Sequence, residues 1–166
     1  MWRSWSKPGL NPRRVGFRTT GMGGKSAKVA AMVAGLDAGP WDRRYVGWFV
    51  CFNRGEYYEA HDVLEDLWLA EGKGGLNYGF YKGLIQLAGA FVHLQKGRLG
   101  PAMALFRLAE ANFALYPARH AGIDLSAVAG MSVEWRNRVE DGAGVNPLGS
   151  DGGMPLVRFP EGLPGT

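Results

Sequence analysis

The side chains best suited to chemistry are concentrated in one short stretch of the chain, residues 52–68. This stretch holds one histidine and five acidic residues, and their spacing is helical. His61 and Glu65 are four positions apart, so on a helix they share one face, about 5–6 Å apart at Cβ. An imidazole and a carboxylate in this arrangement can help to bind a divalent metal ion or act as an acid–base pair. His61 and Glu65 are therefore the candidate catalytic residues.

A second polar group falls on the next apolar segment, residues 77–96. If the two segments fold back on each other around the glycine loop 72–75, Gln86 comes within reach of His61. The same register places Glu65 near Lys82 and His93 near the start of the first segment. We therefore expect a pocket lined by Tyr58, Trp68, Lys82, Gln86 and His93.

Two interpretations of this cluster stay open. In the first it is structural, with His61 donating to Gln86 and Glu65 paired with Lys82 or a backbone group, and the satisfied network fixes the helix packing without a cofactor. In the second it binds a divalent metal ion through His61, Glu65 and His93, or through Asp62 in place of His93. Acid–base chemistry without a metal belongs to the second interpretation too. Asp62 is about 100° around the helix from His61, and we expect it to face solvent.

The elements that must position these residues are helices, because apolar residues recur at three- and four-residue steps. Their expected ranges are 40–53, 56–71, 77–96, 101–116 and 125–139, with a further short helix within 25–36. Asp124 or Ser126 is expected to cap the last helix. No run of alternating apolar residues predicts a sheet. The fold class is therefore all-α, a compact bundle of about five helices with a disordered basic N-terminal arm and a Gly/Pro-rich C-terminal tail.

Charge and composition divide the 166 residues into one domain and two appendages. Residues 1–36 carry seven basic side chains and no acid, whereas the rest carries 12 basic and 15 acidic ones. We therefore expect a flexible basic arm over 1–39, a helical domain over 40–140 and a tail over 141–166. The mildly acidic domain argues against a nucleic-acid partner. Trp2 and Trp5 in the arm suggest docking onto another protein or a second copy.

Several other sites and targeting signals are disfavoured by the sequence. Gly23-Gly24-Lys25-Ser26 imitates a phosphate loop, but Thr19 stands where that motif needs its first glycine. Cys51 is the only cysteine and lies in an apolar run, which indicates a buried thiol. No apolar run reaches the length of a membrane span. The arm is compatible with a transit peptide or with a true start at Met22.

Two motifs together resemble a known family. The first reads Phe52-Asn53-x-Gly55-x-Tyr57-Tyr58-Glu59-Ala60-His61-x-x-Leu64-Glu65-x-x-Trp68, and the second reads Tyr81-x-Gly83-Leu84-Ile85-Gln86-Leu87-Ala88 followed by His93-x-x-x-Gly97. In this order the motifs resemble the uncharacterised family known as domain of unknown function 309, over about residues 41–117. The resemblance implies a compact helical domain and no assigned activity. Its motif positions here are His61, Glu65, Trp68, Gln86 and His93, and the loop 98–102 departs modestly from the family's turn.

The function that we expect is that of a small helical binding or interaction module with a buried His/Glu/Gln cluster. The alternative is a metal-dependent or acid–base hydrolase-like enzyme using His61 and Glu65, with His93 as a third metal ligand. We expect a soluble, cytoplasmic protein without a membrane partner, and either a second copy or another protein as its partner.

Overall fold

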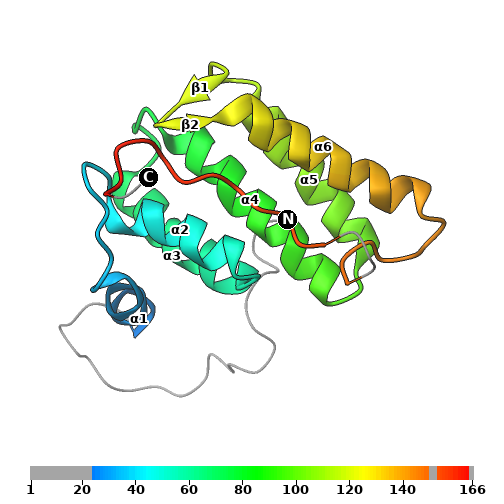
Figure 1. Ribbon diagram of the computed structural model, residues 1–166, viewed down its shortest axis with the longest axis horizontal. Helices are drawn as coiled ribbons and strands as arrows, with labels where there is room; N and C mark the ends of the chain where they lie inside the picture. The colour runs from blue at the N-terminus through cyan, green and yellow to red at the C-terminus, as the bar shows by residue number, and fades with distance from the viewer. Residues whose placement is uncertain (1–23, 150–152, 165–166) are drawn as a thin grey trace.

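The computed structural model describes residues 24–149 and 153–164, and it is built almost entirely from helices (Figure 1). In chain order the elements are α1 (Gly24–Val33), α2 (Arg43–Asn53), α3 (Tyr57–Glu71), α4 (Tyr78–Gln95), α5 (Leu99–Phe113), β1 (Arg119–His120), β2 (Ile123–Asp124) and α6 (Leu125–Asp141). This confirms the expected helical fold. The two strands form an antiparallel hairpin of two residues each, too short for apolar alternation to reveal.

Helix α4 is the centre of the bundle and packs against α3 on one side and α5 on the other (Figure 1). It is apolar on nearly all sides, which suits a helix surrounded by others. Helix α2 is fastened to it by Trp48, whose indole N–H donates to the carbonyl of Leu84 at 3.1 Å. The core around α4 is largely aromatic, and Phe91 contacts rings from α2, α3, α5 and α6.

Short polar side chains cap the starts of α2 and α6. Helix α2 begins at Arg43, three residues beyond Pro40, because the carboxylate of Asp42 accepts from the backbone N–H of Arg44 at 2.8 Å. Asp124 caps α6 in the same way and accepts from the N–H of Ala127 at 3.0 Å. The expected cap at Asp124 is therefore confirmed.

The two ends of the described chain both pack on the bundle. Helix α1 lies against α2 and α3, with Val29 and Val33 buried beside Val63. The C-terminal segment runs extended across the face between α2 and α6 (Figure 1). The expected flexible arm concerns residues 1–39, of which 1–23, with Trp2 and Trp5, lie outside the described residues. Among the described helices, none has the length and apolar character that crossing a membrane requires.

Candidate functional site

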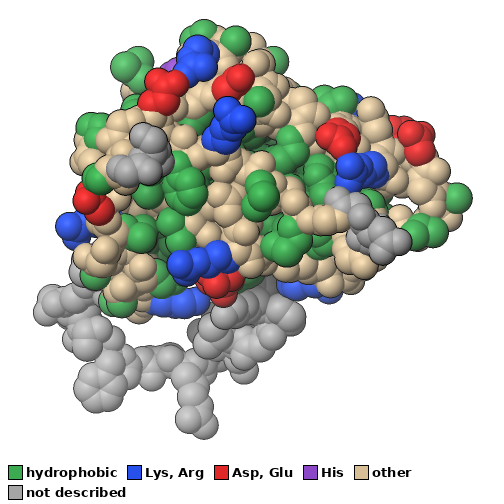
Figure 2. Space-filling model, in the orientation of Figure 1, with side chains coloured by type: hydrophobic (Ala, Val, Ile, Leu, Met, Phe, Trp, Pro, Cys, Tyr) green, Lys and Arg blue, Asp and Glu red, His purple; other side chains and the backbone are tan. Residues whose placement is uncertain are grey.

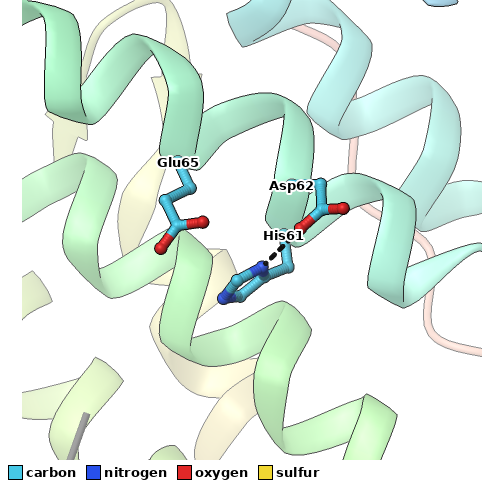
Figure 3. Close-up of side chains that lie close together, drawn as sticks. All are labelled: His61, Asp62 and Glu65. Carbon is cyan, nitrogen blue, oxygen red and sulfur yellow. Dashed lines mark hydrogen bonds and ion pairs between the residues drawn. The ribbon is translucent and has the colours of Figure 1, made fainter. Parts of the chain in front are cut away.

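Three side chains of α3 with metal-binding atoms lie close together (Figure 3). One ligand atom each from His61, Asp62 and Glu65 lies within 4.8 Å of the other two. His61 and Asp62 point toward each other, with Nδ1 and Oδ1 3.3 Å apart. Both are buried, and Glu65 is half-buried. His61 and Glu65 share one face of the helix, and Asp62, one position further on, turns its carboxylate toward the imidazole of His61.

Helix α1 covers this cluster and supplies its positive charge. The ammonium of Lys25 lies 3.3 Å from Oδ1 of Asp62 and donates to Oε2 of Glu65. The next residue, Ser26, donates to Asp66 at 2.7 Å, and Arg44 of α2 donates to the other oxygen of Asp66 at 3.0 Å. Polar contacts thus hold α1 and α2 to the acidic side of α3.

The pKa shifts show which charges this arrangement favours. Burial alone would raise the pKa of Asp62, but the hydrogen bond with His61 and the charge of Lys25 offset it, and the pKa is lowered. Burial likewise works against the charge of Lys25, whereas Glu65 and Asp62 raise its pKa above the ordinary value. The carboxylate of Asp62 and the ammonium of Lys25 are therefore both charged at neutral pH.

The aromatic residues expected around the cluster have structural contacts. The ring of Tyr58 lies parallel to the imidazole of His61, with centroids 6.2 Å apart. Burial raises the pKa of Tyr58, and the charge of Asp62 adds to the effect. Trp68 is buried, stacks on Tyr78 and donates to its carbonyl at 3.1 Å. Trp68 therefore fixes the loop between α3 and α4.

Two side chains have partners that the sequence did not predict. Glu65 pairs with Lys25 of α1 and not with Lys82, which is half-buried on α4. The amide oxygen of Gln86 accepts from Asn112 of α5 at 2.7 Å, so this side chain ties α4 to α5.

Of the two side chains expected as a third ligand, Asp62 lies in the cluster and His93 does not. Asp62 is only 6% exposed, so its expected position facing solvent is wrong. The cause is α1, which covers that side of α3 and which periodicity within α3 could not reveal. His93 lies on α4 and is not one of the three converging residues; burial lowers its pKa, and the charges of Arg98 and Lys96 lower it further.

The residues that sequence reasoning missed are Lys25, Ser26 and Arg44. Their contacts join residues 22 and 40 positions apart, which no local pattern encodes. The signal available in the sequence was charge, because a basic arm that has no acidic residue precedes a helix that has many. The Gly-Lys-Ser sequence that imitates a phosphate loop in fact directs its lysine and serine toward carboxylates.

A thiol nucleophile is excluded by the setting of Cys51. This residue is buried in α2, and burial raises the pKa of its thiol to about 11. Nucleophilic cysteines need a thiolate and therefore a lowered pKa. Cys51 thus serves as a small apolar side chain in the core.

One family model matches the chain, over residues 47–105, and its description is domain of unknown function (DUF309). The matched range holds all three members of the cluster and also Trp68, Gln86 and His93. Residues 47–105 are therefore similar to this family. The resemblance seen in the motifs is confirmed for this range, and the description assigns no activity to the domain. No curated protein and no solved structure matches the chain.

The boundaries of the DUF309 match separate the two sides of the site. The imidazole and both carboxylates of the cluster come from inside the matched range. Lys25 and Ser26 come from α1, which precedes it. The acidic side of α3 therefore lies inside the matched range, and the helix that neutralises it lies outside that range.

Proposed function

We propose that this domain binds a divalent metal ion, with His61, Asp62 and Glu65 as the protein ligands. The observation that carries the proposal is their convergence to within 4.8 Å. Two ligands of one ion lie roughly 3–4 Å apart, because metal–ligand bonds are about 2.0–2.2 Å long. Small rotations of the side chains would bring all three atoms into bonding distance.

The charge of the cluster supports a cation as the ligand. Asp62 and Glu65 place two negative charges close together, and Asp62 is 6% exposed. A buried carboxylate is costly unless a cation or hydrogen bonds compensate it. Lys25 brings one positive charge, on a side chain that is 48% exposed. A divalent ion would match both carboxylates, and the ammonium of Lys25 would have to move aside for it.

The mixture of ligand types narrows the choice of metal. One imidazole nitrogen and two carboxylate oxygens suit Zn²⁺ and the neighbouring transition metals. Ca²⁺ and Mg²⁺ prefer ligand sets made of oxygen alone. Three protein ligands would leave coordination positions for water or for a group of a binding partner.

We place binding ahead of catalysis because a sizeable pocket lies beside the cluster and does not include its side chains. A pocket of about 800 Å³ lies among α1, α2 and α3, and its wall includes Ser26, Arg44 and Asp66. None of the three proposed metal ligands lines it. A hydrolase-like use of His61 and Glu65 therefore stays an alternative. The lone Cys51, a free thiol, fits the cytoplasmic location that we propose.

The test is a Zn²⁺ titration of the full chain, freed of metal by a chelator and followed by isothermal calorimetry. We expect one ion per chain, and we expect Glu65→Gln to weaken the affinity at least about tenfold through loss of a charged ligand. Glu59→Gln is the matched control, since it makes the same change on the same helix outside the cluster. A wild-type chain that binds no Zn²⁺, or two variants with equal affinity, would contradict the proposal.

A further inference from the structure

Helix α1 packs at the edge of the bundle and through a small apolar contact. It lies beside α2 and α3 (Figure 1), whereas the hydrophobic side chains visible on this face gather near its middle (Figure 2). The buried side chains of α1, Val29 and Val33, form with Val63 of α3 a cluster distinct from the main core. The pocket of about 800 Å³ includes Val29, Ala30 and Val33 in its wall, so one side of α1 is not fully packed.

The polar contacts at the start of α1 are made by side chains. The ammonium of Lys25 pairs with Asp62 and Glu65. The hydroxyl of Ser26 donates to Asp66 at 2.7 Å. Both residues belong to the first turn of α1, where free backbone N–H groups give a helix a partial positive charge. The acidic side of α3 is therefore faced by an ammonium and by the positive end of a helix.

The C-terminal segment 153–164 is fastened to the bundle in another way, through its backbone. The side-chain amide of Asn53 donates to the carbonyl of Val157 and accepts from its N–H, both at 2.8 Å. The N–H of Glu161 donates to the carbonyl of Gly122 at 2.9 Å. These bonds join uncharged groups. Of the two segments, α1 is therefore the one whose anchor contains carboxylates that a metal ion would also bind.

A divalent ion bound by the α3 cluster could not share it with Lys25. The ion and the ammonium would contact the same oxygens of Asp62 and Glu65, and two cations within about 4 Å of each other repel strongly in a partly buried site. The side chain of Lys25 is 48% exposed and can turn toward solvent. The positive end of α1 would nevertheless still face the ion. Binding of the ion therefore favours a state in which α1 itself has left the cluster.

Away from the bundle, α1 has little that would keep it helical. It is 10 residues long, and isolated helices shorter than about 12–15 residues are marginal in water. Its first turn has no acidic residue and its last turn has no basic one, so side-chain charges do not complement the macrodipole at either end. The order of α1 therefore depends on its contacts with α2 and α3, and hydrogen exchange can report the loss of those contacts.

We propose that α1 is an autoinhibitory helix of the metal site. Lys25 occupies the cation position in the metal-free protein, and a bound ion releases α1 from α3 and uncovers Val63. This inference rests on the proposed metal site and adds a regulation to it. Because linkage is reciprocal, the ion weakens the docking of α1 by the same factor by which docked α1 weakens binding of the ion. We expect a factor of about five to ten, which corresponds to one partly exposed ion pair.

The test is hydrogen exchange of the full chain at one pH, with and without Zn²⁺, with calorimetry on the same sample to establish that the ion is bound. Exchange in α1 should become about five- to tenfold faster with Zn²⁺, while exchange in α5 stays the same. Lys25→Met should lose most of this acceleration. Unchanged exchange in α1 with Zn²⁺ bound, or equal acceleration in Lys25→Met, would overturn the autoinhibitory role and leave the metal site standing. A chain that binds no Zn²⁺ would overturn both.

A second measurement undocks α1 from its apolar side. Val29→Asn places an amide at a position 1% exposed, outside the main core, so it should release α1 while the bundle stays folded. Its affinity for Zn²⁺ should rise about five- to tenfold, and adding Lys25→Met should raise it no further. Ala31→Asn is the matched control, because it introduces the same residue at an exposed position of α1 and should bind Zn²⁺ as the wild type does. Equal affinities of Val29→Asn and Ala31→Asn would overturn the proposal.

Discussion

Two polar clusters join helices in this molecule, and they are built differently. Between α5 and α6, Nε of Arg136 donates to both carboxylate oxygens of Glu110, at 3.1 and 3.2 Å. Ser132 donates to the same carboxylate at 3.1 Å. Between α1 and α3, by contrast, the carboxylates of Asp62 and Glu65 share the single ammonium of Lys25.

The difference lies in charge balance. The α5–α6 cluster joins two acids, Glu110 and Glu140, to two guanidiniums, those of Arg136 and Arg107, which are permanent cations. The side chains of Arg136 and Glu110 are each 19% exposed. The α1–α3 cluster joins two acids to one ammonium on a half-exposed lysine, with His61 beside them. A cluster that serves stability alone gains nothing from surplus negative charge close to buried atoms. We therefore propose the α3 site as a place for a cationic ligand, whereas the charges of the α5–α6 site balance one another.

The largest expected effect is a loss of stability when the α5–α6 cluster is broken. Arg136→Met should lower the free energy of unfolding by about 2–3 kcal/mol, because it leaves the carboxylate of Glu110 largely buried without its cation. Arg138→Met is the control: its ion pair with Glu134 is exposed and should cost less than about 1 kcal/mol. Urea unfolding measures the free energy of unfolding of both variants. Equal losses in the two variants would contradict the distinction between a buried and an exposed ion pair.

The next effect concerns the lysine that neutralises the α3 cluster. Lys25→Met should raise the affinity for Zn²⁺ about five- to tenfold, because the ion no longer has to displace an ammonium held by an ion pair worth about 1 kcal/mol. Lys28→Met on the same helix is exposed, has no ion pair in the described structure and should change nothing. Calorimetric titration gives both values. An unchanged affinity in Lys25→Met would mean that Lys25 and the metal do not compete.

A smaller expected effect is the difference in stability when one carboxylate is neutralised in each cluster. Glu65→Gln should change the free energy of unfolding by less than about 0.5 kcal/mol, since relief of repulsion from Asp62 offsets the lost contact with Lys25. Glu110→Gln should cost about 1–2 kcal/mol, because it breaks a charge-assisted bond that nothing offsets. Denaturant unfolding without metal compares the two variants. A large loss in Glu65→Gln would indicate that the α3 cluster is structural.

The smallest effect is the pH dependence of α1 packing. The pKa values of Asp62 and Asp66 are lowered in the fold, so their contribution is present above their unfolded pKa, about 3.9, and is lost as pH falls through the folded values. The pKa of Lys25 is raised, so its contribution is present below about 10.4 and is lost as pH rises through the folded value. Protection factors for hydrogen exchange in α1, taken relative to the intrinsic rate at each pH, should therefore be largest between about pH 5 and 9. Lys25→Met should remove the loss of protection at high pH and weaken the loss at low pH, and an unchanged profile would place the titrating groups elsewhere.

Much of the fold could be predicted because it depends on local patterns. The helix periodicity located α3 and α4 to within one or two residues, and the spacing of His61 and Glu65 placed them on one face. The cap at Asp124 is local too, since a carboxylate needs only the N–H groups of the next turn.

The rest of the site depends on contacts between distant parts of the chain. Lys25 meets Glu65 across 40 positions, and Asn53 meets Val157 across 104. Periodicity says which face of a helix is buried but not which segment covers it. Gln86 illustrates the limit: its burial follows from the apolar surroundings on α4, yet its partner came from α5.

The most direct test of the account is a crystal of the full chain soaked in Zn²⁺, with anomalous diffraction recorded on both sides of the zinc absorption edge. We expect one strong anomalous peak about 2.0–2.2 Å from an imidazole nitrogen of His61 and from oxygens of Asp62 and Glu65. The ammonium of Lys25 should have moved away from both carboxylates. No peak at α3, with Lys25 still in place at millimolar Zn²⁺, would contradict the proposed metal site.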